Sequence, residues 1–275
     1  MTSAAPSEFG IEGQVLLEAI YLKYQYDFRQ YASASLQRRL QKALEHFGVA
    51  TLSALQERVL RSSSVFQELL SFLTIQVSEM FRDPSFFRAL RDQVFPILRT
   101  YPSLKVWVAG CSTGEEVLAL SILLREEDLL DRTLIYASDI NPLALEKAQS
   151  GVYDLARIAG FSENYIASGG RASLSDYYTA GYNAAVFDKA LRKNVVFTDH
   201  SLATDQVFAE VHLVSCRNVL IYFKRELQDR AIGLFRDSLC HKGFLGLGSQ
   251  ETLRFSQYAN AFAPYVSQVR IYRKC

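Results

Sequence analysis

One segment constrains the fold of this chain more than any other: VWVAGCSTGEEVLAL, from Val106 to Leu120. It begins as an apolar, valine-rich run, breaks at Gly110, and continues through two acids into an apolar helical pattern. In α/β proteins, a strand followed by a glycine loop and a helix is the unit that holds a nucleotide or cofactor. The segment therefore predicts an α/β domain with a ligand site at this loop.

The composition is that of an ordinary globular protein. Of the 275 residues, 49% are hydrophobic and 21% charged, and the net charge is +1, which gives no indication of nucleic-acid binding. The cysteines are too widely spaced for a disulfide framework or a zinc site, and we predict no metal. The N-terminus MTSAAPSEFGIEG shows no secretory signal, and no apolar run reaches the roughly 18 to 20 residues of a membrane span. We expect a soluble, cytoplasmic protein.

Three regions follow one another along the chain. Residues 1–93 are predicted to form a helical domain, since stretches such as SLQRRLQKALEHFG repeat apolar residues at helical spacing and end at a glycine, Gly48. The two prolines of FPILRTYPSL predict a linker over residues 94–103. Residues 104–275 are predicted to form the α/β domain.

Short β-rich runs alternate with helical stretches beyond residue 103: LKVWVAG, TLIYASD, NVVFTD and VHLVSCRN. This alternation predicts a mainly parallel sheet covered on both faces. The late runs GFLGLGS and SQVRIYRK predict an antiparallel pair at one edge. Glycines with Tyr, Val and Phe between about residues 152 and 193 predict a small antiparallel β-subdomain inserted into the domain.

The chemistry of the glycine loop favours a cationic ligand. Gly110 and Gly114 let backbone approach a ligand at the start of a helix. The loop ends in Glu115 and Glu116, where a phosphate-binding loop ends in Gly-Lys-Ser/Thr, and two anions would repel a phosphate. S-adenosylmethionine carries a sulfonium and an α-amino group, which suit these acids. A purely structural helix start is the alternative.

A further acid ends the second predicted strand. Asp139 lies about 25 residues beyond the glycine loop, where an acid accepts hydrogen bonds from ribose hydroxyls. Alternatively, Asp139 caps the helix that begins at Pro142. Together with the glycine loop, Asp139 favours a ligand that contains adenosine.

Two more stretches place polar groups near this edge. VSCRNVLIYF ends an apolar strand with Arg217 and Asn218, and Tyr222 follows four residues after the Asn. TIQVSEMFRDPSFF, at the end of the helical region, would close the ligand pocket if it folds back over the sheet; a solvated helix face is the alternative. Its polar residues within two turns are Gln76, Ser78 and Arg82.

These motifs together resemble the CheR chemoreceptor methyltransferases. MFRDPSFF, VWVAGCSTGEEVLAL, YASDINPLALEKAQSGVY and CRNVLIYF have counterparts in that family in the same order, and the resemblance runs from about Glu12 to Lys274. It implies a Rossmann-like methyltransferase domain with a β-subdomain insertion, preceded by an all-helical domain. It also implies S-adenosylmethionine-dependent methyl esterification of glutamates on a chemoreceptor's cytoplasmic helices in chemosensory adaptation, with S-adenosylhomocysteine as product.

The resemblance also assigns roles to residues. Arg82 corresponds to an Arg that reaches cofactor and active site, and Tyr222 to a Tyr that faces the methyl group, so these two are the candidate catalytic residues. Gln76 and Ser78 replace the family's usual Asn and Thr, and Ser201 replaces an Asn near the adenine. The candidate cofactor-binding residues are Gln76, Ser78, Arg82, Gly110, Glu116, Asp139, Ser201, Leu202, Arg217 and Asn218.

The expected chemistry needs no general base. A glutamate side chain has a pKa near 4.3, so at neutral pH its carboxylate is already the nucleophile. The enzyme then has to align the reactants and exclude water. An Arg and a Tyr can do this, and a catalytic His or Cys is not required.

The expected partner is a receptor's cytoplasmic helical domain. Arg38, Arg39 and Lys42 form a basic helix face that could meet acidic receptor helices, although a merely solvated face is the alternative. In some family members the β-subdomain docks a receptor's C-terminal peptide by strand addition. The stretch from Asp176 to Leu191 looks shorter than in those members, so we predict that this protein works without the tether. We also expect a monomer.

Three other functions compete with this one. A dinucleotide oxidoreductase would need a fuller G-x-G-x-x-G loop than AGCSTG. A methyltransferase of the same fold could act on another signalling protein or a small molecule. A non-enzymatic adaptor would have no need of the whole set of candidate site residues.

Overall fold

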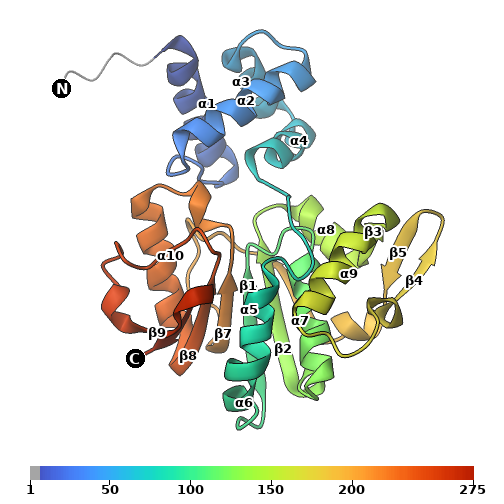
Figure 1. The fold of residues 1–275 in the computed structure, drawn as a ribbon. Helices are drawn as coiled ribbons and strands as arrows, with labels where there is room; N and C mark the ends of the chain where they lie inside the picture. Colours follow the sequence, from blue (N-terminus) through green and yellow to red (C-terminus); the bar gives the residue numbers. More distant parts are fainter. Residues whose placement is uncertain (1–6) are drawn as a thin grey trace.

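The computed structural model describes residues 7–275 (Figure 1). Residues 1–6, which begin the predicted helical domain and the segment without a secretory signal, lie outside the described residues. Within 7–275, no helix combines the length and apolarity that crossing a membrane requires.

The helices are α1 (Glu8–Tyr24), α2 (Ser33–Phe47), α3 (Leu52–Arg61), α4 (Ser63–Leu73), α5 (Pro84–Ala89), α6 (Phe95–Leu98), α7 (Glu115–Glu126), α8 (Pro142–Ser150), α9 (Ile158–Ala167) and α10 (Arg225–Ser238). The strands are β1 (Leu104–Ala109), β2 (Thr133–Asp139), β3 (Val152–Asp154), β4 (Tyr178–Gly181), β5 (Ala184–Phe187), β6 (Val195–Asp199), β7 (Val211–Cys216), β8 (Leu239–Leu247), β9 (Phe262–Val266) and β10 (Ile271–Lys274).

Helices α1 to α4 form a bundle at one end of the molecule (Figure 1). In α2, Leu36, Leu40 and Leu44 recur at helical spacing and are buried. Gly48 ends the helix in the left-handed conformation, with φ of 61°, and its N–H donates to the carbonyls of Glu45 and Leu44. The sequence pattern of this helix and its predicted end are confirmed.

A seven-stranded sheet forms the centre of the other domain, in the order β6-β2-β1-β7-β8-β10-β9. The first five strands of this order are parallel to one another. Alternate residues of β1 face opposite cores: Val106 and Val108 pack in the core that contains α7, and Trp107 packs with Phe235 of α10. The predicted mainly parallel sheet with both faces covered is confirmed.

The prediction for the sheet edge was wrong in one respect. Strands β8 and β10 are antiparallel neighbours as expected, but β9 pairs with β10 and lies outside them. The sequence prediction contained no strand at the run FAPYV, which forms β9 and includes Pro264, a residue without a backbone N–H for the ladder. An edge strand tolerates such a residue, since one side of it needs no partner strand.

The first half of the predicted linker at residues 94–103 is helical, and turns follow over residues 99–103. A π-helical turn, η1 (Leu90–Val94), joins α5 to α6, and Phe95 N–H donates to the carbonyl of Leu90. This wider turn accommodates Pro96 within the helical run. Phe81, Phe87 and Leu98 lie in the core of the sheet domain. We therefore propose that the helical domain ends near residue 74 and not at residue 93.

A second, three-stranded antiparallel sheet, β3-β5-β4, forms the β-subdomain together with α9 (Figure 1). Tyr182 and Asn183 connect β4 to β5 with φ of 49° and 61°. Two successive left-handed residues are typical of a tight type I′ hairpin. Strands β4 and β5 have four residues each, and whether a receptor peptide adds to them stays a prediction.

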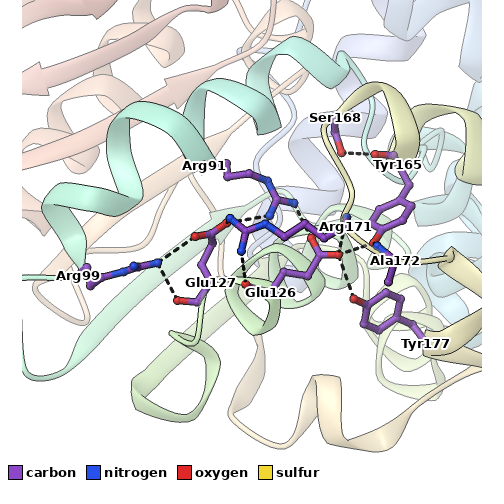
Figure 2. Close-up of polar contacts among 9 residues, drawn as sticks. All are labelled: Arg91, Arg99, Glu126, Glu127, Tyr165, Ser168, Arg171, Ala172 and Tyr177. Carbon is purple, nitrogen blue, oxygen red and sulfur yellow. Dashed lines mark hydrogen bonds and ion pairs between the residues drawn. The ribbon is translucent and has the colours of Figure 1, made fainter.

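A buried ion network fixes this subdomain to the main domain (Figure 2). Glu126, at the end of α7, pairs with Arg91 of η1 at 2.5 Å and accepts hydrogen bonds from the hydroxyls of Tyr165 and Tyr177. Glu127 pairs with Arg91 at 2.8 Å, and Arg99 and Arg171 pair with it too. The network joins three segments that are far apart in the sequence.

We predict that Glu126→Gln lowers the free energy of unfolding by about 3 kcal/mol, because it leaves buried Arg91 without one of its carboxylates. Glu57→Gln, which breaks the exposed pair with Arg61, should cost less than about 0.5 kcal/mol. Burial raises the pKa of Glu126, but hydrogen bonds from Tyr165, Arg91 and the Arg171 amide together lower it by more. The pKa of Glu126 is therefore below its ordinary value.

A lowered pKa stabilises the fold above the unfolded value near 4.5, and this stabilisation is lost as the pH falls through the folded pKa. The stability difference between wild type and Glu126→Gln should therefore shrink below about pH 4.5. Urea unfolding at pH 7 measures the stability loss in each variant. The same measurement at pH 4 shows how the loss in Glu126→Gln changes with pH. A difference that stays constant with pH would contradict the proposed ionised network.

Candidate active site

The largest set of candidate residues meets in one cavity, where β6, β2, β1 and β7 end and the helical domain lies over them. It encloses about 910 Å³, open solvent at its mouth included. All but one of the predicted site residues line it: Gln76, Ser78, Arg82, Gly110, Glu116, Asp139, Leu202, Arg217, Asn218 and Tyr222.

The glycine loop forms the floor of the cavity. Gly110 has φ of 73°, and a Cβ there would come within 2.5 Å of Val219 Cγ2. Gly114, with φ of 88°, would bring a Cβ within 2.7 Å of Ala148 Cβ. The loop is therefore packed between neighbouring segments, and only glycine fits both positions without strain.

Asp139 is buried beneath the loop. Its Oδ2 accepts a hydrogen bond from the Ser112 amide at 2.8 Å, and Oδ1 accepts one from the Asn141 amide at 3.0 Å. Burial raises the pKa of Asp139, although these amides oppose the rise. Asn141 is the residue that caps α8, through the amides of Leu143 and Ala144. The alternative in which Asp139 caps this helix is thus wrong, and its remaining lone pairs can accept ribose hydroxyls.

The two acids of the glycine loop face different surroundings. Glu115 is fully buried and pairs with Arg157 at 2.7 Å, outside the cavity lining. Glu116 lines the cavity, and its carboxylate accepts from Ser215 Oγ at 2.6 Å and Arg217 Nη1 at 3.1 Å. The predicted acid for the cationic end of a ligand is therefore Glu116 alone.

Arg217 holds the cavity wall together. Its Nη2 donates to the carbonyl of Arg82 at 2.7 Å and to Asp83 Oδ2 at 2.8 Å, while Nη1 reaches Glu116. The guanidinium lies 4.2 Å from the centre of the Phe86 ring. Arg217 thus ties the segment with Arg82 to the end of β7.

The segment from Thr74 to Arg82 is not helical, so the alternative of a solvated helix face is wrong, and most of its residues line the cavity above the strand ends. Gln76 accepts a hydrogen bond from Ser112 Oγ at 2.7 Å and donates to Thr74 Oγ1 at 3.1 Å. Asn141 Nδ2 also donates to Thr74 Oγ1, at 3.0 Å. These contacts connect the segment directly to the glycine loop and to the end of β2.

The helical domain adds residues that sequence reasoning missed. Tyr31 pairs with Phe223 in an isolated antiparallel bridge, and the Ala32 amide donates to the Tyr222 carbonyl at 2.8 Å. Both Tyr31 and Arg39 line the cavity. Two domains therefore build the site.

The prediction that Arg39 belongs to an exposed basic face is wrong. Arg38 and Lys42 are exposed, but Arg39 is only 8% exposed. Its guanidinium donates to the carbonyls of Leu73 and Ser35, and Nη2 has no hydrogen-bond partner among residues 7–275. The signal was present in the sequence, since Arg39 falls on the apolar stripe beside Leu40.

Ser201 is the one candidate that does not line the cavity. Its amide donates to Asp205 Oδ2 at 2.9 Å, and its hydroxyl accepts from the Ala203 amide at 3.2 Å. The neighbours on both sides, His200 and Leu202, line the cavity instead. No motif pointed to His200, whose Nε2 lies 3.1 Å from the Gln206 carbonyl oxygen.

The residues along the row of strand ends suit an elongated ligand with a cationic end. Glu116 lies near β7, the glycine loop follows at β1, Asp139 at β2, and Leu202 beyond β6. An acid for an amine, a carboxylate for a ribose and an apolar wall for a base follow in the order in which S-adenosylmethionine carries these groups. The residues present therefore fit this cofactor.

Comparison with known proteins agrees with this interpretation. A family model described as "CheR methyltransferase, SAM binding domain" matches residues 76–269, and another, "CheR methyltransferase, all-alpha domain", matches residues 11–74. A Pseudomonas putida protein called putative methyltransferase Cher3 is 59% identical over 264 residues, 96% of this chain and 97% of its own length.

More distant relatives carry more specific names. The chemotaxis protein methyltransferase of Listeria monocytogenes is 29% identical over 229 residues, 82% of this chain and 84% of its own length. Among solved structures, phosphoethanolamine N-methyltransferase 1 of Haemonchus contortus has 15% identity and a TM-score of 0.34 over 61% of this chain and 26% of its own, too partial a likeness to add to the assignment. On the two family models, which together span most of the chain, this protein belongs to the CheR methyltransferase family, and its cofactor is S-adenosylmethionine.

Proposed function

We propose that this protein transfers the methyl group of S-adenosylmethionine to glutamate side chains of a chemoreceptor, forming methyl esters and S-adenosylhomocysteine. The observation that carries the proposal is the buried guanidinium of Arg39 in the cavity wall, with Nη2 unpaired among the described residues. A buried charge without a full set of partners is costly, and burial lowers the pKa of Arg39. An anionic substrate such as a carboxylate would offset this cost.

The residues around Arg39 suit a carboxylate acceptor. Its guanidinium lies 6.0 Å from the centre of the Tyr222 ring, and Arg82 lines the same cavity. The cofactor supplies an activated methyl group, and a carboxylate needs no base to attack it. We propose that Arg39 and Arg82 hold the carboxylate while the Tyr222 hydroxyl orients the accepting oxygen.

The relatives support a receptor as the substrate, because several of them at 27% to 29% identity are named chemotaxis protein methyltransferases. The Pseudomonas putida relative at 59% identity is named only a putative methyltransferase. Methylation of another signalling protein or a small molecule is therefore the alternative. The cytoplasmic location and the monomeric state stay predictions.

Methyl-labelled S-adenosylmethionine distinguishes these substrates. We expect label on a receptor-sized band when the protein is incubated with receptor-containing membranes, and none with receptor-free membranes. Label in both preparations on a different protein, or only in small molecules, would favour the alternative substrates.

The two neighbouring arginines of α2 should respond differently to substitution. Arg39→Ala is predicted to lower kcat/KM for the receptor about 100-fold, because a hydrogen bond to a charged group is lost in a buried site. Arg38→Ala, which removes an exposed charge, should lower it less than about threefold, and that effect should vanish at high salt.

Kinetics at low and high ionic strength, with thermal unfolding as the folding control, test this difference. A salt-sensitive loss in both variants would mean that Arg39 acts only as part of a surface charge. An unchanged kcat/KM in folded Arg39→Ala would show that Arg39 does not bind the substrate.

A further inference from the structure

Glu251 is a buried acid that neither the motifs nor the family comparison singled out. It lies just after β8 and is 4% exposed. Its Oε2 accepts hydrogen bonds from the amides of Gly248 at 2.6 Å and Asn218 at 3.1 Å. Its Oε1 accepts from the amides of Val219 at 2.9 Å and Leu220 at 2.7 Å. One carboxylate therefore joins the turns that follow two adjacent parallel strands.

The turn after β7 is shaped to receive an anion. Asn218 has φ of 60°, in the left-handed region, and Val219 follows in the right-handed region with φ of −114° and ψ of −49°. Such alternation directs successive amides to one point and forms an anion-binding concavity. Glu251 fills it, and no Lys, Arg or His pairs with Glu251 within residues 7–275.

The surroundings of this carboxylate are closely packed. Burial raises the pKa of Glu251, and the amides that it accepts from oppose the rise. Gly248 leaves the room that the contact needs, because a Cβ there would lie 2.8 Å from the Asn218 amide nitrogen and 2.9 Å from Glu251 Oε2. The turn is thus held closely by a single side chain.

The turn that Glu251 holds carries much of the site. Asn218, Val219 and Tyr222 line the cavity. Val219 is the side chain against which Gly110 of the glycine loop packs. The carbonyl of Tyr222 accepts the Ala32 amide of the helical domain. A shift of the turn would therefore move the cavity wall, the glycine loop and the domain contact together.

We infer that Glu251 is a positioning residue, which sets the turn of residues 218–222 so that Asn218 meets the cofactor and Tyr222 meets the acceptor. The effect on cofactor affinity depends only on the family assignment. The effect on receptor turnover rests on the proposed function.

The informative variant is Glu251→Gln, which keeps the size of the side chain. One oxygen of the amide can still accept from two amides of the turn, but its NH2 group would face the other two donors. Two buried N–H groups then lose their acceptor. Gly248→Ala disturbs the same contact without removing the charge, and Glu226→Gln makes the same chemical change at an exposed position.

We expect Glu251→Gln and Gly248→Ala each to weaken S-adenosylhomocysteine binding about tenfold by calorimetry. Both should lower kcat for receptor methylation about 100-fold, since small misplacement of reacting groups has effects of this size. Amide exchange should rise in residues 218–222, while the thermal midpoint stays within a few degrees of wild type. Glu226→Gln should match wild type in all four measurements.

The outcomes separate the two proposals. Faster exchange in the turn with unchanged affinity and unchanged kcat would make Glu251 merely structural and overturn the inference. Weakened binding in both variants supports it even if no receptor is methylated by wild type, an outcome that would sink the proposed function alone. If Glu251→Gln does not fold, Gly248→Ala decides by the same criteria.

Discussion

Replacing Asp139 by Asn should weaken S-adenosylhomocysteine binding about 100-fold. The carboxylate already accepts the amides of Ser112 and Asn141, one on each oxygen. An Asn side chain would turn an NH2 group toward one of these donors and would offer fewer acceptors to the ribose hydroxyls. Calorimetric titration of the folded variant with S-adenosylhomocysteine measures the loss.

The chain offers a matched control at the next strand. Asp199 ends β6 directly opposite Asp139 in the parallel register, yet it does not line the cavity. Asp199→Asn should keep the wild-type affinity within about twofold. Equal losses in the two variants would show that the effect comes from the strand ends in general and not from a ribose contact by Asp139.

The second large effect concerns turnover. Arg82→Ala should lower kcat/KM for the receptor about 1,000-fold, and Tyr222→Phe about 100-fold, because each removes a group that stabilises or orients charge in a partly enclosed site. None of the ion pairs within residues 7–275 includes the Arg82 side chain, which is therefore free to meet a substrate. The Tyr222→Phe change removes only a hydroxyl and keeps the ring beside Arg39.

Initial rates over a range of receptor concentrations test these assignments. Arg88→Ala on α5 is the control for Arg82, because Arg88 is exposed and donates only to the carbonyl of Ala167. Its kcat/KM should stay at the wild-type value. If Arg82→Ala and Tyr222→Phe both fold and both keep full turnover, the catalytic assignment fails.

Local patterns were sufficient to predict much of this architecture. TLIYASD was predicted as a strand and forms β2 over the same residues, because its side chains are buried or half-buried on the two faces of a strand inside the sheet. The strand ends bring Glu116, Asp139 and Asn218 to one edge, as parallel topology requires. Residues could be placed without a structure where the alternation along a strand, or the common edge at which parallel strands end, determines their position.

Two prolines lie within elements that tertiary packing stabilises. Pro96 indicated a linker, but a π-helical turn absorbs it within a buried helical run. The prediction contained no strand at FAPYV; Pro264 fits there because β9 is an edge strand with a neighbour on one side only. In both cases the element forms although the proline lacks an N–H, because burial of the flanking apolar residues stabilises it.

Contacts between segments that are far apart in the sequence could not be predicted from local sequence patterns. Arg39 enters the cavity only because α2 packs over the sheet, although its place on the apolar stripe was a usable signal. Glu251 is more extreme, since its role depends on amides of a turn more than thirty residues away. A sequence shows that an acid is present, but not which amides converge on it.

The most direct test of the central claim is the chemical lability of the transferred methyl group. Receptor labelled with methyl-labelled S-adenosylmethionine by this protein is isolated and exposed to mild base, and volatile methanol is counted. A methyl ester on glutamate predicts that the label leaves the receptor as methanol. Label that stays on the receptor after base treatment would mean an N- or S-methyl product and would contradict glutamate esterification, while leaving the cofactor assignment in place.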